Sequence, residues 1–327
     1  MKIGMISFAH MHAYSYAHAL KRNPDAELAG ITDDDPERGR RMAEELGIPW
    51  FERTEELLAA SDAVVICSEN AKHAEYTIQA ANAGKHILCE KPISTNVKDA
   101  EAMIEAAERN GVQLMIAFPC RFSTVAKRTK KLVESGKLGK LVAINGTNRG
   151  TMPGGWFIDR SMAGGGAVMD HTVHVMDLMR WYMPDAEVTE VYAEVDNRFH
   201  PDLDIDDSGL LTFTFDNGVI ATLDPSWSRS KSFPVWGDVT LDILGTNGTS
   251  KVDLFKQNVL LHSDDTMKTT ENFYGDDSDQ GLIDHFIDCI MHNKPVSPNG
   301  VDGLRAMEVA LAAYRSAELQ QPVTLRK

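Results

Sequence analysis

Short apolar runs alternate with amphipathic stretches through the first third of the chain. Apolar runs typical of strands fall at 2–7, 27–32, 62–67, 86–89 and 112–118, and helical periodicity occupies 12–22, 36–46, 70–83 and 97–110. Such alternation predicts strand–helix–strand units on a parallel sheet. Gly47, Gly84 and Gly111 each follow a predicted helix, where a glycine in the left-handed conformation commonly ends one.

The pattern changes after residue 120. A basic helix at 125–134 and a helix at 167–183 are followed by strand-like runs at 187–195, 209–215, 219–227, 239–244 and 249–255. Asn217-Gly218 and Asn247-Gly248 favour tight hairpins, because both residue types accept a positive φ. Two last helices, at 280–292 and 303–318, would cover this sheet or return to the first domain. We expect an α/β domain with a doubly wound parallel sheet at 1–120 and an α+β domain with a mostly antiparallel sheet at 121–327.

The composition is that of a packed globular protein. The 327 residues are 43% hydrophobic and 25% charged, which excludes collagen-like and wholly disordered chains, and the length favours two domains. The 48 acidic residues outnumber the 33 basic ones, for a net charge of −15. Because a surface this acidic repels phosphate backbones and anionic lipid, nucleic acid and membranes are not expected partners.

The location expected from the sequence is the cytoplasm. No apolar run approaches the ~18 residues of a membrane helix, and the first residues lack the pattern of a secretory signal. Cys67, Cys89, Cys120 and Cys289 lie far apart without CxxC spacing, which favours reduced thiols.

The turn after the first predicted strand lacks the glycines of the dinucleotide-binding GxGxxG pattern. Ser7, Ala9 and His12 stand at the three glycine positions. Ser7 and Ala9 are small enough for close approach to a pyrophosphate, and His10 and His12 could donate to a phosphate or reach the nicotinamide. An ordinary strand–helix turn with surface histidines explains these residues equally well.

Asp33 ends the second predicted strand, where an acidic residue of a dinucleotide-binding domain binds the adenosine ribose. Asp34 and Asp35 follow it directly. We expect a 2′-phosphate to meet uncompensated negative charge here, which favours NAD over NADP. The alternative is a solvated acidic turn that caps the helix beginning at Pro36.

Glu90-Lys91-Pro92 follows a strand expected to be buried. A lysine at the carboxyl end of a parallel strand faces the ligand crevice, where its ammonium could polarise a hydroxyl or a carbonyl. Taken alone, the tripeptide is more often part of a surface loop.

The segment 164–177 joins a glycine turn to a helix with ionisable residues. Asp170 and His174 are four residues apart on one helix face, so the carboxylate can lie beside the imidazole as in a general-base pair. Capping by Asp170 and core packing by His174 are the structural alternative.

Two further patterns bear on metal binding, and neither is specific. His171 and His174 form HxxH, a weak signal without further ligands. Asp202, Asp204 and Asp206 resemble the start of a calcium loop, but Phe213 stands where the bidentate glutamate is required, which favours a solvated loop. We expect no bound metal.

Together these motifs resemble the Gfo/Idh/MocA family of nicotinamide-dependent sugar and polyol oxidoreductases over nearly the whole chain. Glu90-Lys91-Pro92 is similar to the family's EKP motif, Gly164-Gly165-Gly166 with Asp170 and His174 resembles its GGG-x3-D-x3-H block, and 303–323 is similar to its final helix and strand. The resemblance implies an N-terminal Rossmann domain and a C-terminal open-faced sheet through which homodimers or homotetramers form.

The resemblance also implies roles for individual residues. Lys91 would bridge the cofactor and the reacting hydroxyl, His174 would exchange the proton, and Asp170 would assist it. The cofactor NAD would contact Ser7, Phe8, Ala9, His10, His12, Asp33, Ser68, Asn70, His73, Glu90, Lys91 and Pro92. The substrate would contact Lys91, Arg121, Trp156, Asp170, His171 and His174. Trp156 is expected to stack on a sugar face, and an interdomain salt bridge is the structural alternative for Arg121.

The implied function is NAD-dependent oxidation of a secondary alcohol of a sugar, polyol or glycoside. Two alternatives stay open. One is a redox-neutral lyase or hydrolase that cleaves a glycoside with recycled NAD, and the other is a non-enzymatic sensor of a dinucleotide or sugar. The missing glycines favour a sensor, whereas Lys91, Asp170 and His174 argue against it, because a sensor has no chemical need for a proton-transfer set.

Overall fold

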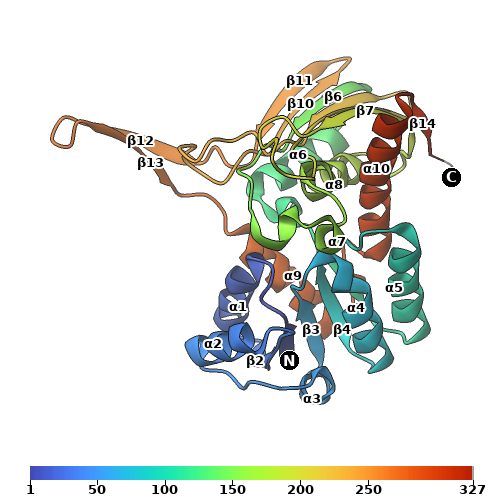
Figure 1. Cartoon of the computed structure of the whole chain (residues 1–327). Coiled ribbons are helices and arrows are strands. Elements are labelled where there is room, and N and C mark those ends of the chain that lie inside the picture. Colours follow the sequence, from blue (N-terminus) through green and yellow to red (C-terminus); the bar gives the residue numbers. More distant parts are fainter. Residues whose placement is uncertain (326–327) are drawn as a thin grey trace. The chain divides into compact units, whose positions relative to one another are not determined.

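The computed structural model describes residues 1–325, which form two compact units. Unit 1 comprises Met1–Pro119, Gly155–Gly165 and Asp279–Glu308, and unit 2 comprises Cys120–Gly154, Gly166–Ser278 and the chain from Val309 onwards. Figure 1 labels many of the helices and strands of both. The domain boundary expected at residue 120 assigns 155–165 and 279–308 to the second domain, whereas the contacts group both segments with unit 1.

Unit 1 is built on a parallel sheet of strand order β2-β1-β3-β4-β5 (Figure 1). The strands are β1 (Lys2–Ile6), β2 (Glu27–Thr32), β3 (Ala63–Ile66), β4 (His86–Glu90) and β5 (Leu114–Ala117). β3 and β5 are buried along their whole length, as expected of parallel strands covered on both faces. β1 pairs with both β2 and β3, so the strand order reverses beside β1, where doubly wound sheets bind ligands.

The helices of unit 1 follow the predicted rhythm with two differences. They are α1 (His12–Arg22), α2 (Pro36–Leu46), α3 (Thr54–Ala60), α4 (His73–Asn82), α5 (Val97–Arg109), α7 (Arg160–Ala163), α9 (Ser278–Met291) and the 3₁₀ turns η1 (Asn70–Lys72) and η3 (Gly155–Ile158). The sequence did not predict α3, and it merged η1 with α4. Asp35 caps α2 by accepting from the Glu37 and Arg38 amides at 3.0 and 3.1 Å, and Gly47 ends it with a φ of 63°.

Hydrogen bonds attach α9 to α1 within unit 1. The Arg22 guanidinium donates to Gln280 at 2.7 Å, and Gln280 donates to the Ala19 carbonyl at 3.2 Å. The Ile116 amide of β5 donates to the Pro298 carbonyl at 3.1 Å. The closing helices were expected either to cover the second sheet or to return to the first domain. α9 therefore belongs to the first domain.

Unit 2 contains a mixed sheet of strand order β11-β10-β6-β9-β8-β7-β14 (Figure 1). The strands are β6 (Leu141–Thr147), β7 (Val188–Asp196), β8 (Ser208–Phe215), β9 (Ile220–Asp224), β10 (Thr240–Gly245), β11 (Gly248–Asp253) and β14 (Val323–Thr324). Only the β6–β9 pairing is parallel within this described sheet, which confirms the predicted class. Asn247-Gly248 and Asn217-Gly218 lie at the predicted hairpins.

The helix that carries the predicted catalytic residues is buried in unit 2. This helix, α8 (Ala167–Tyr182), packs against β6, β8 and α6 (Thr124–Glu134). Its buried face includes Val168, Val175 and Leu178. α10 (Gly300–Leu319) runs from unit 1 into unit 2.

A two-stranded ribbon, β12 (Asn258–Ser263) and β13 (Lys268–Phe273), extends away from the other strands of unit 2 (Figure 1). The sequence did not predict it. Val259, Leu260 and Leu261 are more than half exposed, so neither face of the ribbon shows the alternation of a half-buried strand.

The four cysteines are buried free thiols, in agreement with the expectation of reduced cysteines. In residues 1–325, no helix has both the length and the apolar character needed to cross a membrane.

Candidate functional site

Most of the predicted cofactor residues gather at the carboxyl ends of the parallel strands of unit 1. Ser7 follows β1, Asp33 follows β2, Ser68 follows β3, and Glu90 ends β4 with Lys91 next to it. All five side chains are buried. Because parallel strands end along one edge of the sheet, these residues from separate parts of the sequence form one region.

Ser7 takes over the conformation of the missing first glycine. Its φ is 67°, in the left-handed region that residues with a Cβ rarely adopt. Its amide donates to the Thr32 carbonyl at 2.8 Å, and its hydroxyl accepts from the Ala9 amide at 3.1 Å. The turn therefore keeps the tight geometry of a dinucleotide-binding turn without glycine.

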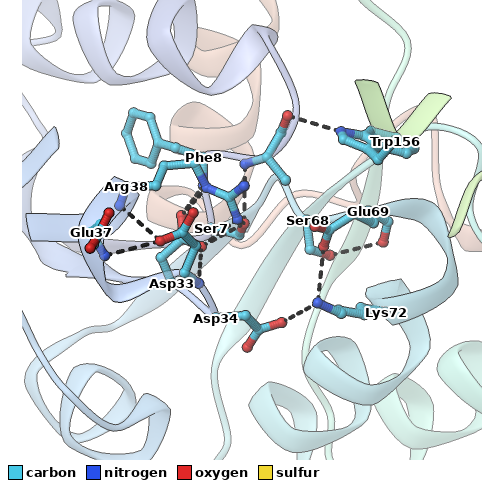
Figure 2. A network of polar contacts seen from close by, with 12 residues as sticks. Ser7, Phe8, Asp33, Asp34, Glu37, Arg38, Ser68, Glu69, Lys72 and Trp156 are labelled. Atoms are coloured by element: carbon cyan, nitrogen blue, oxygen red, sulfur yellow. Dashed lines mark hydrogen bonds and ion pairs between the residues drawn. The ribbon is translucent and has the colours of Figure 1, made fainter. Parts of the chain in front are cut away.

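Figure 2 shows how the Asp33 carboxylate is held. It accepts from the Phe8 amide at 2.7 Å, and the Arg38 guanidinium forks onto it with contacts of 2.9 and 2.5 Å. This hydrogen bond to Asp33 is the main cause of the raised pKa of Arg38. The Asp33 carboxylate thus accepts from a turn amide that could otherwise donate to a pyrophosphate, and the Arg38 guanidinium balances the charge of this carboxylate.

The expectation of uncompensated negative charge after β2 is wrong. Besides the Asp33–Arg38 pair, the Asp34 carboxylate lies 2.6 Å from Lys72 Nζ (Figure 2). It also accepts from the Tyr76 hydroxyl. Burial alone would raise the pKa of Asp34, but these two hydrogen bonds outweigh burial and hold the pKa below its usual range. Basic side chains from α2 and η1 therefore neutralise the acidic turn.

His10, His12 and Glu90 form a cluster beside the same turn. His12 Nδ1 lies 3.0 Å from Glu90 Oε1, and His10 Nε2 lies 3.9 Å from Glu90 Oε2. The His12 amide donates to His10 Nδ1 at 3.2 Å, and the Tyr16 hydroxyl lies 3.4 Å from His12 Nδ1. Burial favours a neutral Glu90, but the facing His10 and His12 outweigh it and lower the Glu90 pKa well below its usual range.

The other predicted cofactor side chains hold the loops together. His73 Nδ1 lies 2.8 Å from the Pro92 carbonyl, its Nε2 lies 3.3 Å from the Ser68 carbonyl, and Asn70 donates to the Ala163 carbonyl at 2.9 Å. The Lys91–Pro92 peptide bond is cis. Burial lowers the pKa of His73 despite these carbonyl acceptors. The loop after β3 thereby supports the loop that carries Lys91.

Trp156 packs against the turn after β1 within unit 1. Its indole N–H donates to the Ala9 carbonyl at 3.0 Å (Figure 2). Its ring stacks on Phe157 with centroids 3.9 Å apart, and the His10 ring lies 6.0 Å away. Trp156, which was expected to stack on a sugar, thus stacks on Phe157 in this structure.

In unit 2, α8 carries Asp170, His171 and His174, all of which are buried. The Asp170 carboxylate accepts from the Trp227 indole N–H at 3.2 Å and lies 3.2 Å from His171 Nε2. His174 follows one turn later on the face of Asp170. The pairing of Asp170 with His174 stays a prediction, and the contacts of Asp170 with Trp227 and His171 are ones that the sequence did not predict.

A carboxylate 40 residues away caps the N-terminus of α8. Asp206 accepts from the Gly166 amide and the Val168 amide, both at 2.9 Å, and from the Tyr314 hydroxyl at 2.9 Å. A Cβ on Gly166 would lie 1.9 Å from the Asp206 carbonyl oxygen, which explains the glycine. The expected solvated loop is therefore wrong for Asp206, which is buried, although Asp202 and Asp204 are exposed.

Arg121 is held in a buried ion pair. Its Nε and one terminal nitrogen lie 2.7 and 2.6 Å from the two Asp177 oxygens, and both residues belong to unit 2. Of the two interpretations of Arg121, the salt bridge is present in the structure, but within one unit and not between domains.

The residues of unit 1 fit a dinucleotide. The left-handed Ser7 provides the tight turn, Asp33 lies where its carboxylate could accept from ribose hydroxyls, and both lie beside the strand reversal at β1 and β3. The sequence reasoning missed Arg38, Lys72, Trp227 and Asp206. The sequence does contain a weak signal for Arg38, because a basic side chain in the first turn of a helix can reach back to the preceding aspartates. It contains no signal for the partners that are distant in sequence.

Comparison with protein families gives two matches that cover most of the chain. A model described as an oxidoreductase family with an NAD-binding Rossmann fold matches residues 1–118, and a model of the Gfo/Idh/MocA C-terminal domain matches residues 126–251.

Individual relatives match over nearly their full length. An uncharacterized oxidoreductase of Bacillus subtilis, YrbE, is 31% identical, with 94% of this chain and 91% of the relative covered. A myo-inositol 2-dehydrogenase of Thermotoga maritima is 29% identical, with 100% and 99% covered. The crystal structure of a probable dehydrogenase from Thermotoga maritima has a TM-score of 0.86 at 28% identity, with 99% and 98% covered.

Proposed function

The chain belongs to the Gfo/Idh/MocA family of oxidoreductases, and we propose that it oxidises a secondary alcohol of a sugar, cyclic polyol or glycoside. It is an NAD-dependent dehydrogenase of CH–OH groups. The observation that carries the substrate proposal is the buried Lys91 at the end of β4, together with Asp170 and His174 on α8. An ammonium, an imidazole and a carboxylate suit the removal of a proton from a hydroxyl.

The roles of the residues follow from their chemistry. NAD, when bound, accepts the hydride from the carbon that bears the hydroxyl. The Lys91 ammonium stabilises the alkoxide that develops on the oxygen, and a neutral His174 imidazole accepts the hydroxyl proton. Asp170, held by the Trp227 indole at 3.2 Å, orients the substrate hydroxyl as a hydrogen-bond acceptor. Arg121 and His171 line the substrate, with Arg121 fixed by Asp177.

The NAD contacts are proposed at the turn after β1 and along the neighbouring strand ends. Asp33, which now accepts from the Phe8 amide at 2.7 Å, would hold the ribose hydroxyls of NAD, and the Phe8 amide would then be able to donate to the pyrophosphate. The loops with Ser68, Asn70, His73 and Pro92 border the nicotinamide half. Ser7 already has the left-handed conformation of a tight turn, which supports this placement of the pyrophosphate.

The substrate class is tested by the near-ultraviolet absorbance of NADH, with the wild-type protein, NAD and a panel of inositols, aldoses, alditols and glycosides. Reduction of NAD by one or more members supports the proposal, and inositols come first because the Thermotoga maritima relative is a myo-inositol 2-dehydrogenase. Cleavage of a glycoside without net NADH would instead assign the redox-neutral alternative. Binding of NAD and sugar with no reaction in either direction would assign the sensor.

The assembly and location belong to the same proposal. We place the enzyme in the cytoplasm, where its four buried thiols stay reduced, and expect a homodimer or homotetramer formed through the unit 2 sheet. Light scattering after size-exclusion chromatography distinguishes these states from a monomer of 36.1 kDa.

A further inference from the structure

Three side chains able to ligate a metal converge in unit 1. His10 lies in the turn after β1, His12 begins α1 and Glu90 ends β4. One ligand atom from each lies within 4.8 Å of the other two, and no second group of three meets this condition among residues 1–325. The Glu90 and His10 side chains are 0% and 2% exposed, whereas His12 is 29% exposed.

The geometry points to a binding site for one divalent transition-metal ion, with His10, His12 and Glu90 as its ligands. An ion about 2.1 Å from each ligand in a tetrahedral arrangement needs ligand atoms roughly 3.4 Å apart. The separations here are 3.0 Å between His12 Nδ1 and Glu90 Oε1 and 3.9 Å between His10 Nε2 and Glu90 Oε2. These two contacts, made to the two oxygens of the same carboxylate, each lie within about half an ångström of the required distance.

The donor types select the metal. Two imidazole nitrogens and one carboxylate oxygen suit zinc, cobalt or nickel, whereas magnesium and calcium prefer oxygen ligands throughout. Three protein ligands leave a fourth position open, as in catalytic zinc sites. His12 is the partly exposed member of the cluster, so a water molecule or an oxygen of a bound ligand would enter on its side.

The surroundings hold the ligands in place. The Lys91 amide donates to Glu90 Oε2 at 3.0 Å, which fixes the carboxylate, as outer hydrogen bonds do at metal sites. The His12 amide donates to His10 Nδ1, so a neutral His10 carries its hydrogen on Nε2. Ligation through His10 Nε2 and His12 Nδ1 leaves the ring hydrogens on His10 Nδ1 and His12 Nε2, and the metal replaces both the hydrogen bond from the His12 amide to His10 Nδ1 and the contact of His12 Nδ1 with Glu90 Oε1.

The test is calorimetric titration of zinc into chelator-treated, tag-free full-length protein without NAD or sugar. We expect one equivalent bound, and an anomalous peak between the three side chains in crystals soaked with zinc. Because neither readout needs the cofactor or substrate, failure here leaves the proposed dehydrogenase function untouched, and the reverse also holds.

His12→Gln is the deciding variant, because its partly exposed side chain is the ligand least needed for packing. We expect it to weaken zinc binding ~100-fold or more, since changes to outer contacts alone cost about 10- to 100-fold. His18→Gln, at an exposed histidine of the same helix, should bind zinc like the wild type. A wild type that takes up no zinc, or a His12→Gln variant that binds it unchanged, would overturn the site and leave a purely hydrogen-bonded cluster.

Discussion

At the scale of single residues, the positions of the candidate site could be predicted, but the partners of its side chains could not. Lys91 and Asp33 lie at strand ends, as their sequence neighbours imply. The contacts of Asp170 with Trp227 and of Arg121 with Asp177 join residues 57 and 56 positions apart. Sequence periodicity is a local signal, so it carries no information on such pairs.

Substitutions of Ser7 are expected to reveal how much stability its left-handed backbone conformation costs. Ser7→Gly removes a conformational strain of about 1–2 kcal/mol but also the hydroxyl that accepts from the Ala9 amide, worth about 1 kcal/mol. Ser7→Ala loses the hydroxyl and keeps the strain. Chemical denaturation should therefore find the alanine variant roughly 1–2 kcal/mol less stable than the glycine variant, and an alanine variant of equal or higher stability would contradict the account.

The Asp33–Arg38 pair makes a prediction about the cofactor. The wild type should bind NAD more tightly than NADP, because Asp33, the proposed partner of the ribose hydroxyls, also holds the Arg38 guanidinium. Asp33→Ser releases the guanidinium for a 2′-phosphate, so the ratio of NADP to NAD affinity, measured by calorimetry, should rise about 10- to 100-fold. Asp33→Ser combined with Arg38→Gln is the control and should lose this gain. An equal rise in both variants would show that Arg38 does not bind the phosphate.

At the scale of elements, predictions succeeded where local signals mark both ends of a helix. α2 has the predicted bounds, and it carries Asp35 and Pro36 at its start and Gly47 at its end. α3 was missed because its seven residues are too few for helical periodicity to stand out. The β12–β13 ribbon was missed because it is exposed on both faces and therefore lacks an alternating pattern.

The start of α8 depends on a cap that no local sequence signal shows. Gly166 has no side chain to cap the helix, and Asp206 supplies both hydrogen bonds instead. Asp206→Ala should therefore lower the free energy of unfolding by about 1–2 kcal/mol, as the loss of a strong N-cap does. The matched control is Asp204→Ala, in the same loop but exposed, with an expected change within ~0.5 kcal/mol. A similar loss in the free energy of unfolding for both variants would contradict the capping role.

At the scale of the whole molecule, the sequence predicted the two sheets and their classes but not which later segments complete the first unit. Trp156 covers the Ala9 carbonyl, and Gln280 of α9 binds α1, although both residues lie beyond the expected boundary at 120. Composition and periodicity could not reveal this, because the helical pattern of α9 suits either domain.

A fragment of residues 1–120 is therefore expected not to fold by itself. It lacks α9, η3 and the Pro298 carbonyl that accepts from Ile116 in β5, so apolar surface of the parallel sheet would be exposed. Denaturant titration followed by circular dichroism should show a cooperative transition for the full chain and none for the fragment. A cooperative transition of the fragment would show that residues 1–120 form a complete domain.

The central claim is that Lys91 and His174 perform one proton-transfer step in an NAD-dependent oxidation. The most direct test is the turnover of the Lys91→Met and His174→Asn variants on the best substrate of the panel. General acid–base groups contribute about 10²- to 10⁴-fold, so each variant should lose turnover on that order, keep its NAD affinity and lose little more when the two are combined. Lys98→Met and His262→Asn, at exposed positions, should turn over like the wild type. Folded Lys91 and His174 variants that bind NAD and retain wild-type turnover would contradict the claim.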